Sequence, residues 1–236
     1  TVLPMRVRAL LVLMSGAAVY PAVPAPTTLG ADLDLWSLLP AVACEALIGI
    51  CMGVIASLPL VFLEAGGTVM GQMMGFGLAR VYNPETDTDM DVMGQTFFYI
   101  GAAAFLAMDG LEALFAAVLR TFGRLPIGAL HAGATPLDVV VETLTSGFEL
   151  ALRVGAPVAG VVLLLIVLFA AIGKTMPQIN IMSVGFTVKI IAGLSITVFA
   201  VRAIDVAAGD AVRAAVDSAV RWADSLHAPA LSAPQP

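Results

Sequence analysis

The feature that most constrains this chain is a series of long apolar stretches, each about the length of a membrane-crossing helix. A helix needs about 20 apolar residues to cross the hydrocarbon core of a bilayer. Sixty per cent of the 236 residues are hydrophobic and 12% are charged, against about 45–50% and about 25% in an ordinary soluble domain. The sequence therefore predicts an all-α membrane protein, or a subunit that buries most of its surface against partners. The apolar stretches are 7–23, 38–63, 92–119, 148–172 and 181–203, and a glycine-rich helix is expected over 66–81.

Ionisable side chains lie within or beside several of these stretches. A charge that faces lipid near a helix centre costs at least about 2.5 kcal/mol, so we expect Asp109 and Glu112, deep in 92–119, to face protein or water. Arg153 and Lys174 either lie near helix ends and extend toward the bilayer surface or contact protein. The Lys and Arg bias between connections is too weak to orient the chain. A chain that reaches its position inside an assembly can dispense with such a bias.

Several functional classes are not supported by the sequence. A net charge of −6 argues against nucleic-acid binding. Cys44 and Cys51 would lie about 10 Å apart along one helix, too far for a disulfide. His131 and His227 have no nearby cysteine, and the sequence contains no phosphate-binding loop. The sequence thus favours a protein that is not an enzyme and that needs no metal or cofactor.

Small residues recur every fourth position in the expected glycine-rich helix. On a helix, this spacing forms one stripe that lets another backbone approach closely. Two interpretations remain open, packing within the chain and contact with another subunit. The residues are Gly67, Gly71, Gly75 and Ala79.

An acidic loop follows this helix, with four carboxylates in seven positions. Its alternating aspartates suggest a calcium loop, but such a loop needs a glycine at its sixth position and a glutamate at its twelfth. Counted from Asp87, these positions hold Val92 and Phe98, so a solvated polar loop is the better alternative. The loop residues are Asn83, Pro84, Glu85, Asp87, Asp89 and Asp91.

Methionines crowd both sides of the acidic loop. Methionine is unbranched and adapts to irregular shapes, so these residues could form a deformable seal in a pore. Ordinary core filling is the alternative use of methionine. Met70, Met73 and Met74 precede the loop, and Met90 and Met93 lie at its end.

The last helix, expected over 204–226 or as part of one long helix over 181–226 with a bend at Gly209, carries charges of both signs spaced three or four residues apart. Such neighbours stabilise a helix by about 0.2–0.5 kcal/mol per pair. We interpret the charged face of this helix as facing water. The alternative is that it lines a pore or contacts another subunit. The charged residues are Asp210, Arg213, Asp217, Arg221 and Asp224.

Three segments together resemble one protein family. Residues 71–79 read GQMMGFGLA and are followed by Asn83-Pro84; residues 125–128 read LPIG; residues 177–180 read PQIN, with Gly185-Phe186, Lys189 and Gly193-Leu194 after them. Their order and spacing are similar to the FliR/SctT export-gate family of type III secretion. Thr187 stands where the family usually has proline, and Asn83 where aspartate is more frequent, which puts local loop chemistry in doubt.

The resemblance implies a core subunit of the flagellar export gate, which forms and gates the pore for unfolded flagellar proteins. It implies a FliP-like helical part over 1–146, a FliQ-like hairpin with the charged last helix over 147–226, and a tail over 227–236. It also implies a further apolar helix before Thr1. In the family, one such chain joins FliP and FliQ subunits in the bacterial inner membrane, within the flagellar basal body, where it also meets lipid.

Two site assignments come from the resemblance alone. The loop over 82–93 corresponds to the family's plug, which lies in the pore and moves when substrates pass. The turn after the fourth apolar stretch corresponds to a cytoplasmic contact with FlhB. Its candidate residues are Lys174, Pro177, Gln178 and Asn180.

Two other functions remain compatible with the sequence. The first is the injectisome counterpart within the same family. The second is a stand-alone secondary transporter, which would need paired repeats and a midplane site with ionisable groups. We find no convincing internal repeat in the sequence.

Overall fold

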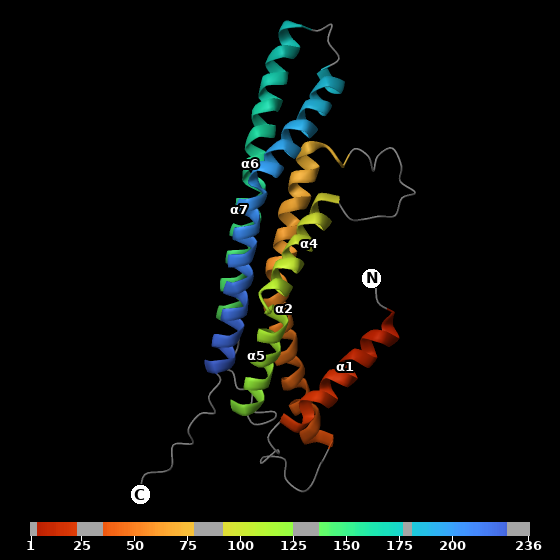
Figure 1. Cartoon of the computed structure of the whole chain (residues 1–236), viewed down its shortest axis with the longest axis vertical. Helices are drawn as coiled ribbons and strands as arrows, with labels where there is room; N and C mark the ends of the chain where they lie inside the picture. The colour runs from red at the N-terminus through yellow and green to blue at the C-terminus, as the bar shows by residue number, and fades with distance from the viewer. Residues whose placement is uncertain (1–3, 23–34, 78–91, 125–136, 177–180, 226–236) are drawn as a thin grey trace, which may run out of the picture.

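The computed structural model describes residues 4–22, 35–77, 92–124, 137–176 and 181–225. Over these ranges the chain is all-helical, as the sequence predicts (Figure 1). Three helices contain stretches long and apolar enough to cross a membrane, Leu38–Met74, Leu137–Thr175 and Ser183–Ser225. The elements are α1 (Met5–Val19), η1 (Tyr20–Ala22), α2 (Leu35–Met74), α4 (Val92–Ala107), α5 (Gly110–Arg124), α6 (Leu137–Thr175) and α7 (Ile181–Ser225).

Helix α2 is the centre of the bundle and contacts α4, α5, α6 and α7. The sequence divides this region into an apolar stretch over 38–63 and a separate glycine-rich helix over 66–81, but the structure corrects this to one continuous helix. The Gly66-Gly67 pair does not break it, because a helical glycine costs only about 0.5–1 kcal/mol relative to alanine and the pair allows close packing against neighbours.

The end of α2 also differs from the expectation. The helix ends at Met74, because Gly75 adopts the left-handed conformation with φ of 99°. The backbone N–H of Phe76 donates to the carbonyl oxygen of Gly71 at 3.0 Å, and that of Gly75 donates to Gln72 at 3.0 Å. This pair of bonds is the Schellman motif, which satisfies the last carbonyls of a helix and stops it. The expected four-residue stripe therefore stays on a helix only as far as Gly71.

The stretch over 92–119 is not one helix. It breaks at Met108 and Asp109 into α4 and α5, which are bent by 64°. Asp109 has φ of 54°, a conformation that aspartate tolerates better than most side chains, and its carbonyl accepts the N–H of Ala113 at 3.0 Å. Asp109 and Glu112 thus lie at the break between α4 and α5, and both side chains are exposed. Glu112 is in the first turn of α5, where the helix dipole favours a negative charge.

Helices α6 and α7 form a long antiparallel hairpin. The α7 helix runs unbroken from Ile181 to Ser225, so Gly209 does not divide it. At 1.5 Å per residue, α7 is about 65 Å long, roughly twice the hydrocarbon thickness of a bilayer. The tip of the hairpin extends past the end of α2 (Figure 1).

Two buried clusters hold the bundle together. One joins α2, α5 and α7 around Met52, Ile55 and Trp222. The other joins α2, α4, α6 and α7 around Met70, Phe97 and Val154. Large apolar areas of the helices are not covered by other parts of the chain. In the most apolar 18-residue stretch of α7, only 11% is buried. Helix α1 stands away from the bundle (Figure 1), and its apolar side chains face outward.

Candidate functional site

The structure brings together two of the sequence segments that carry the family resemblance. Gly75, at the end of α2, lies against Phe186 near the start of α7; a Cβ on Gly75 would be 2.8 Å from its ring. The preceding residue, Met74, packs against Gly193 of α7, which has no side chain to block it. Residues more than a hundred positions apart therefore meet at the point where α2 ends.

Glycines set the spacing between helices around this point. A Cβ on Gly67 would lie 2.8 Å from the carbonyl oxygen of Met93 and 3.0 Å from the Cα of Gly94 in α4. A Cβ on Gly66 would lie 3.0 Å from the carbonyl oxygen of Ala151 in α6. Adjacent glycines thus serve two different helices. Sequence reasoning identified Gly67 by its four-residue spacing but missed Gly66, which lies outside that register.

The other members of the predicted glycine stripe lie differently. Gly71 is buried in α2, Gly75 lies after the helix, and Ala79 lies outside the described residues. Gly53, whose spacing from Gly49 resembles that of the stripe, has open space around it.

The methionines predicted as a seal divide into two groups. Met70 and Met74 are fully buried in the core shared by α2, α4, α6 and α7. Met73 is 40% exposed and Met93 is half-buried beside the same core. Burial favours core filling for the first pair. Met90 lies outside the described residues, as do the loop residues Asn83, Pro84, Glu85, Asp87, Asp89 and Asp91.

The helix ends that bracket this acidic segment lie part-way along the apolar hairpin. Met74 is level with Gly193 on α7 and Val158 on α6. From Gly193, the apolar part of α7 continues about 18 Å to Ile181 and about 13 Å to Arg202. The chain thus leaves α2 within the apolar span, about 13 Å from the level of Arg202 on α7 and about 7 Å from that of Arg153 on α6.

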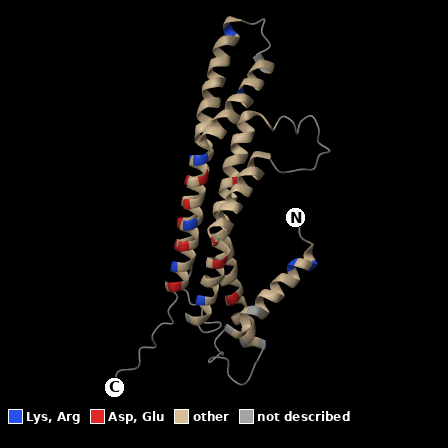
Figure 2. Cartoon of the chain, viewed as in Figure 1, with Lys and Arg blue, Asp and Glu red and all other residues tan. Residues whose placement is uncertain are grey.

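Charged side chains are segregated along the hairpin (Figure 2). They gather along the half of α7 farther from the tip, while the tip half is nearly free of them. On α6 the apolar span begins after Arg153 and ends before Lys174, about 32 Å away; Lys174 is exposed in the last turn. The remaining residues of the predicted turn, Pro177, Gln178 and Asn180, lie outside the described residues.

Ion pairs in the charged half join different helices. Arg221 of α7 lies 3.8 Å from Glu142 of α6 and donates to the Ser218 hydroxyl at 2.7 Å. Arg120 of α5 lies 3.5 Å from Asp224 of α7. The charges of the last helix therefore connect helices as well as facing water, a role that spacing within one helix does not reveal.

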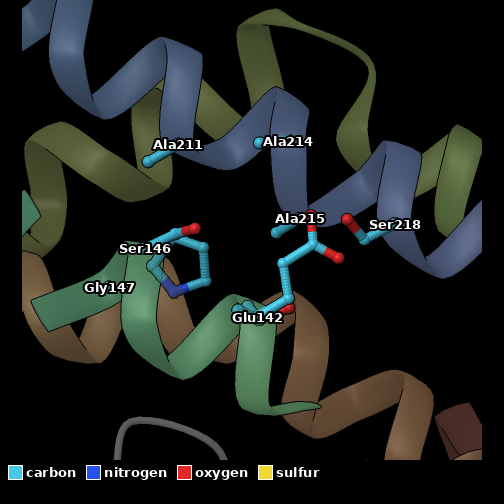
Figure 3. Close-up of a pocket in the computed structure, with 9 residues that line it drawn as sticks. Glu142, Ser146, Gly147, Ala211, Ala214, Ala215 and Ser218 are labelled. Carbon is cyan, nitrogen blue, oxygen red and sulfur yellow. The ribbon is translucent and has the colours of Figure 1, made fainter. Parts of the chain in front are cut away.

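The space between Glu142 and Ser218 is shown in Figure 3. Glu142 points from α6 toward α7, and Ser146 and Ala215 flank it. The cavity has a volume of about 20 Å³, which is enough for one water molecule and too little for a larger ligand. Among the residues that the structure describes, no three His, Cys, Asp or Glu side chains gather as a metal site would require. This geometry is that of a packed structural joint.

Comparison with known families decides which protein class this architecture represents. The family model of the bacterial export proteins, family 1, matches residues 1–214. The chain belongs to this family.

Curated relatives of this family-1 export protein are mostly flagellar. The flagellar biosynthetic protein FliR of Bacillus subtilis (strain 168) is 24% identical over 149 residues, covering 62% of this chain and 58% of that protein. FliR of Caulobacter vibrioides is 24% identical over 220 residues, covering 91% and 85%. The Yop proteins translocation protein T of Yersinia pestis is 22% identical over 186 residues, covering 77% and 70%. The family resemblance drawn from the sequence is therefore confirmed.

Proposed function

We propose that this family-1 export protein is a core subunit of the flagellar type III export gate, in the bacterial inner membrane. It forms and gates the pore through which unfolded flagellar proteins pass. Family membership and the flagellar relatives support this assignment. The protein works passively, by shape and packing, and the energy for export comes from other components.

The observation that carries the pore assignment is the depth at which α2 and α4 end. The segment between them, 78–91, contains Glu85 and three aspartates. It leaves α2 beside Gly193, within the apolar span of the hairpin. A carboxylate that stayed at that depth would be costly against lipid. A water-filled passage or a protein lining on this side of the hairpin removes the cost.

We propose that the loop over 82–93 is the plug of this passage. The exposed Met73 lies near the end of α2, and the half-buried Met93 lies in the first turn of α4. With Met90 they form a flexible seal around the loop, because methionine packs against irregular surfaces. Opening then requires the loop to move when a polypeptide enters.

The partners follow from the same proposal. Residues 1–146 act as a FliP-like part and 147–226 as a FliQ-like hairpin, so that one copy of the chain joins FliP and FliQ subunits. The exposed apolar side chains of α1 and of the hairpin, such as Leu13, Ile166 and Ile191, supply surface for these contacts. FlhB binds near Lys174 and the turn at 177–180.

Co-purification tests the assembly. The chain is expressed with FliP and FliQ counterparts, and the complex is isolated through a tag on this chain. We expect a stable complex containing all three proteins. A chain that is stable and monomeric alone and that never retains the other two contradicts the gate assignment.

Ion conductance tests the plug. Deletion of Glu85–Asp91 in the assembled gate should raise ion leak across the membrane, because the segment no longer fills the passage. The matched control keeps the length and removes charge, with asparagine at 87, 89 and 91. If leak follows the deletion but not the control, the segment acts by volume. A tight and fully active deletion variant rules the plug out.

A second candidate is the injectisome gate, favoured by the similarity to the Yersinia pestis protein. Complementation distinguishes the two. The gene is introduced into a strain lacking the flagellar subunit and into a strain lacking the injectisome subunit. Restored motility without restored effector secretion supports the flagellar gate, and the reverse supports the second candidate.

A further inference from the structure

A cavity opens between α6 and α7 where the apolar half of the hairpin meets the charged half. Its volume is about 550 Å³, within the range of sites for small molecules. Two arginines, Arg153 and Arg202, are among the residues that line it. Its other lining residues are Val154, Pro157, Ala200, Ala203, Ile204, Val206, Ala207 and Asp210.

The local sequence explains why the helices leave this space. Pro157 has no N–H to donate to the carbonyl of Arg153, four residues earlier, and a proline ring inside a helix pushes the preceding turn away. On the facing side, Ala200, Ala203 and Ala207 are too small to fill the gap. Both causes are built into the chain.

A second cavity continues the first one away from the hairpin tip. It has a volume of about 130 Å³, and Arg153 and Asp210 line both spaces. Glu149 and Ser146 complete its polar wall. Along the two helices away from the tip, the charged lining residues are first Arg202 and Arg153 and then Asp210 and Glu149.

The level of the guanidinium groups matches a bilayer surface. The apolar span of α6 runs about 32 Å from Arg153 to Lys174, close to the ~30 Å hydrocarbon core. Arginine at this depth reaches the phosphate layer. Beyond Arg202 toward the tip, Phe199 is 87% exposed, and beyond Pro157, Leu164 is 69% exposed. Phe199 is four residues from Ala203, and Leu164 is seven residues from Pro157, so helical spacing puts both on the faces that line the cavity, where they offer an apolar wall.

We propose that this groove binds a phospholipid with an ethanolamine headgroup. The phosphate lies between Arg153 and Arg202, and the ammonium group lies against Glu149 and Asp210. The acyl chains run toward the tip, over Phe199 and Leu164.

Charge complementarity selects this headgroup. Two arginines and two carboxylates give the groove no net charge, which matches a zwitterion better than an anionic lipid. The positive charges lie closer to the hydrocarbon, which is the order of phosphate and amine in the lipid. A phosphatidylcholine headgroup has no N–H to donate to the carboxylates, and phosphatidylglycerol has no cation.

The arginines are free to make these contacts. Arg153 pairs with Glu149 at 2.6 Å, but both side chains are more than 60% exposed. Because a guanidinium has five N–H donors, it can hold that carboxylate and a phosphate together. Arg202 is exposed and makes no ion pair within the residues that the structure describes.

Native mass spectrometry of the whole chain tests the site. The protein is reconstituted in nanodiscs of equal parts phosphatidylethanolamine, phosphatidylglycerol and phosphatidylcholine and is then released in the gas phase. We expect phosphatidylethanolamine to remain bound in excess of its share. Equal retention of the three lipids, or preferential retention of phosphatidylglycerol, overturns the proposal. This comparison needs no variant, so it stands even where a substitution prevents folding.

Substitutions then place the lipid in the groove. Arg202→Gln and Arg153→Gln should each reduce retained phosphatidylethanolamine about tenfold, the effect of losing one charge-assisted hydrogen bond. Asp210→Asn should remove the preference for phosphatidylethanolamine over phosphatidylcholine. The control is Arg213→Gln, because Arg213 lies on the same helix and contacts Met108 at 3.0 Å, outside both cavities. Retention that is unchanged in all three groove variants contradicts the site.

A partner helix with a carboxylate is the competing occupant of this groove. In that case Arg202→Gln would release a co-purifying protein, while lipid retention stayed the same in the mutant and the parent. That result would also overturn the lipid site. It would leave the export-gate proposal intact, so the two proposals fail separately.

Discussion

The carbonyl oxygen of Ala151 lies 3.0 Å from the point that a Cβ on Gly66 would occupy. This places the backbones of α2 and α6 in direct contact. On the next residue, Gly67 makes an equally close approach to α4. Helix α2 is therefore held between two neighbours through two consecutive glycines, and the position of the segment after it depends on both contacts.

The close contact at Gly67 predicts that one added methyl group lowers the stability of the protein. A Cβ on this residue would lie 2.8 Å from the carbonyl oxygen of Met93, and a backbone atom, unlike a side chain, cannot rotate out of the way. Overpacking costs about 1–3 kcal/mol, and the better helix propensity of alanine returns about 0.5–1 kcal/mol. Gly67→Ala should thus lower the free energy of unfolding by about 1–2 kcal/mol, measured by denaturant titration in detergent micelles.

Gly53→Ala is the matched control on the same helix. Gly53 has nothing within 4 Å of its Cβ position, so only the propensity gain remains, about 0.5–1 kcal/mol of stabilisation. If both variants change stability in the same direction, the close approach of α2 and α4 is not what Gly67 provides.

Gly75 should tolerate substitution poorly for a different reason. Its φ of 99° is a left-handed conformation that costs an L-residue about 1–2 kcal/mol. Gly75→Ala should therefore destabilise the protein by about that amount, and the Phe186 ring, 2.8 Å from the new Cβ, must also move. Gly75→Asn should cost less backbone energy, because asparagine enters this conformation more readily. Equal losses in the two variants would assign the effect to the Phe186 contact.

Much of this architecture could be predicted from the sequence, because apolar length and helical spacing are local properties. The all-α class and the long last helix follow from them. The division of α2 was wrong because the Gly66-Gly67 pair looks like a break until its neighbours are known. The bend at Asp109 was not predicted, because an acidic residue inside an apolar stretch does not by itself indicate a positive φ.

The site depends on register, which no single segment contains. The contact of Gly75 with Phe186 follows only when the offset between α2 and α7 is fixed. The shared level of Arg153 and Arg202 likewise requires the offset within the hairpin. Sequence reasoning singled out Arg153 as a charge beside an apolar stretch, near a helix end or in contact with protein, but it had no means of pairing it with Arg202.

The break between α4 and α5 predicts opposite effects of two substitutions at Asp109. Asp109→Gly removes the left-handed penalty and should leave stability unchanged or raise it by up to about 1 kcal/mol. Asp109→Val should cost about 2 kcal/mol, because a β-branched residue is strained at this φ. Thermal unfolding followed by circular dichroism measures both. A valine variant as stable as the parent would show that α4 and α5 straighten, so that residue 109 leaves the left-handed conformation.

The charged end of the bundle should depend on packing more than on ion pairs. Trp222 is 5% exposed in the cluster of α2, α5 and α7, and removing such a side chain costs about 3–5 kcal/mol. The Arg120–Asp224 pair spans 3.5 Å with side chains 52% and 38% exposed, where a pair contributes about 0.2–1 kcal/mol. Trp222→Ala should therefore lower stability several times more than Arg120→Ala, measured by denaturant titration followed by circular dichroism. Raising the salt concentration should weaken only the contribution of Arg120, because screening acts on exposed charges. An Arg120→Ala loss as large as that of Trp222→Ala, and insensitive to salt, would mean that this pair is shielded from water and stabilises the joint in its own right.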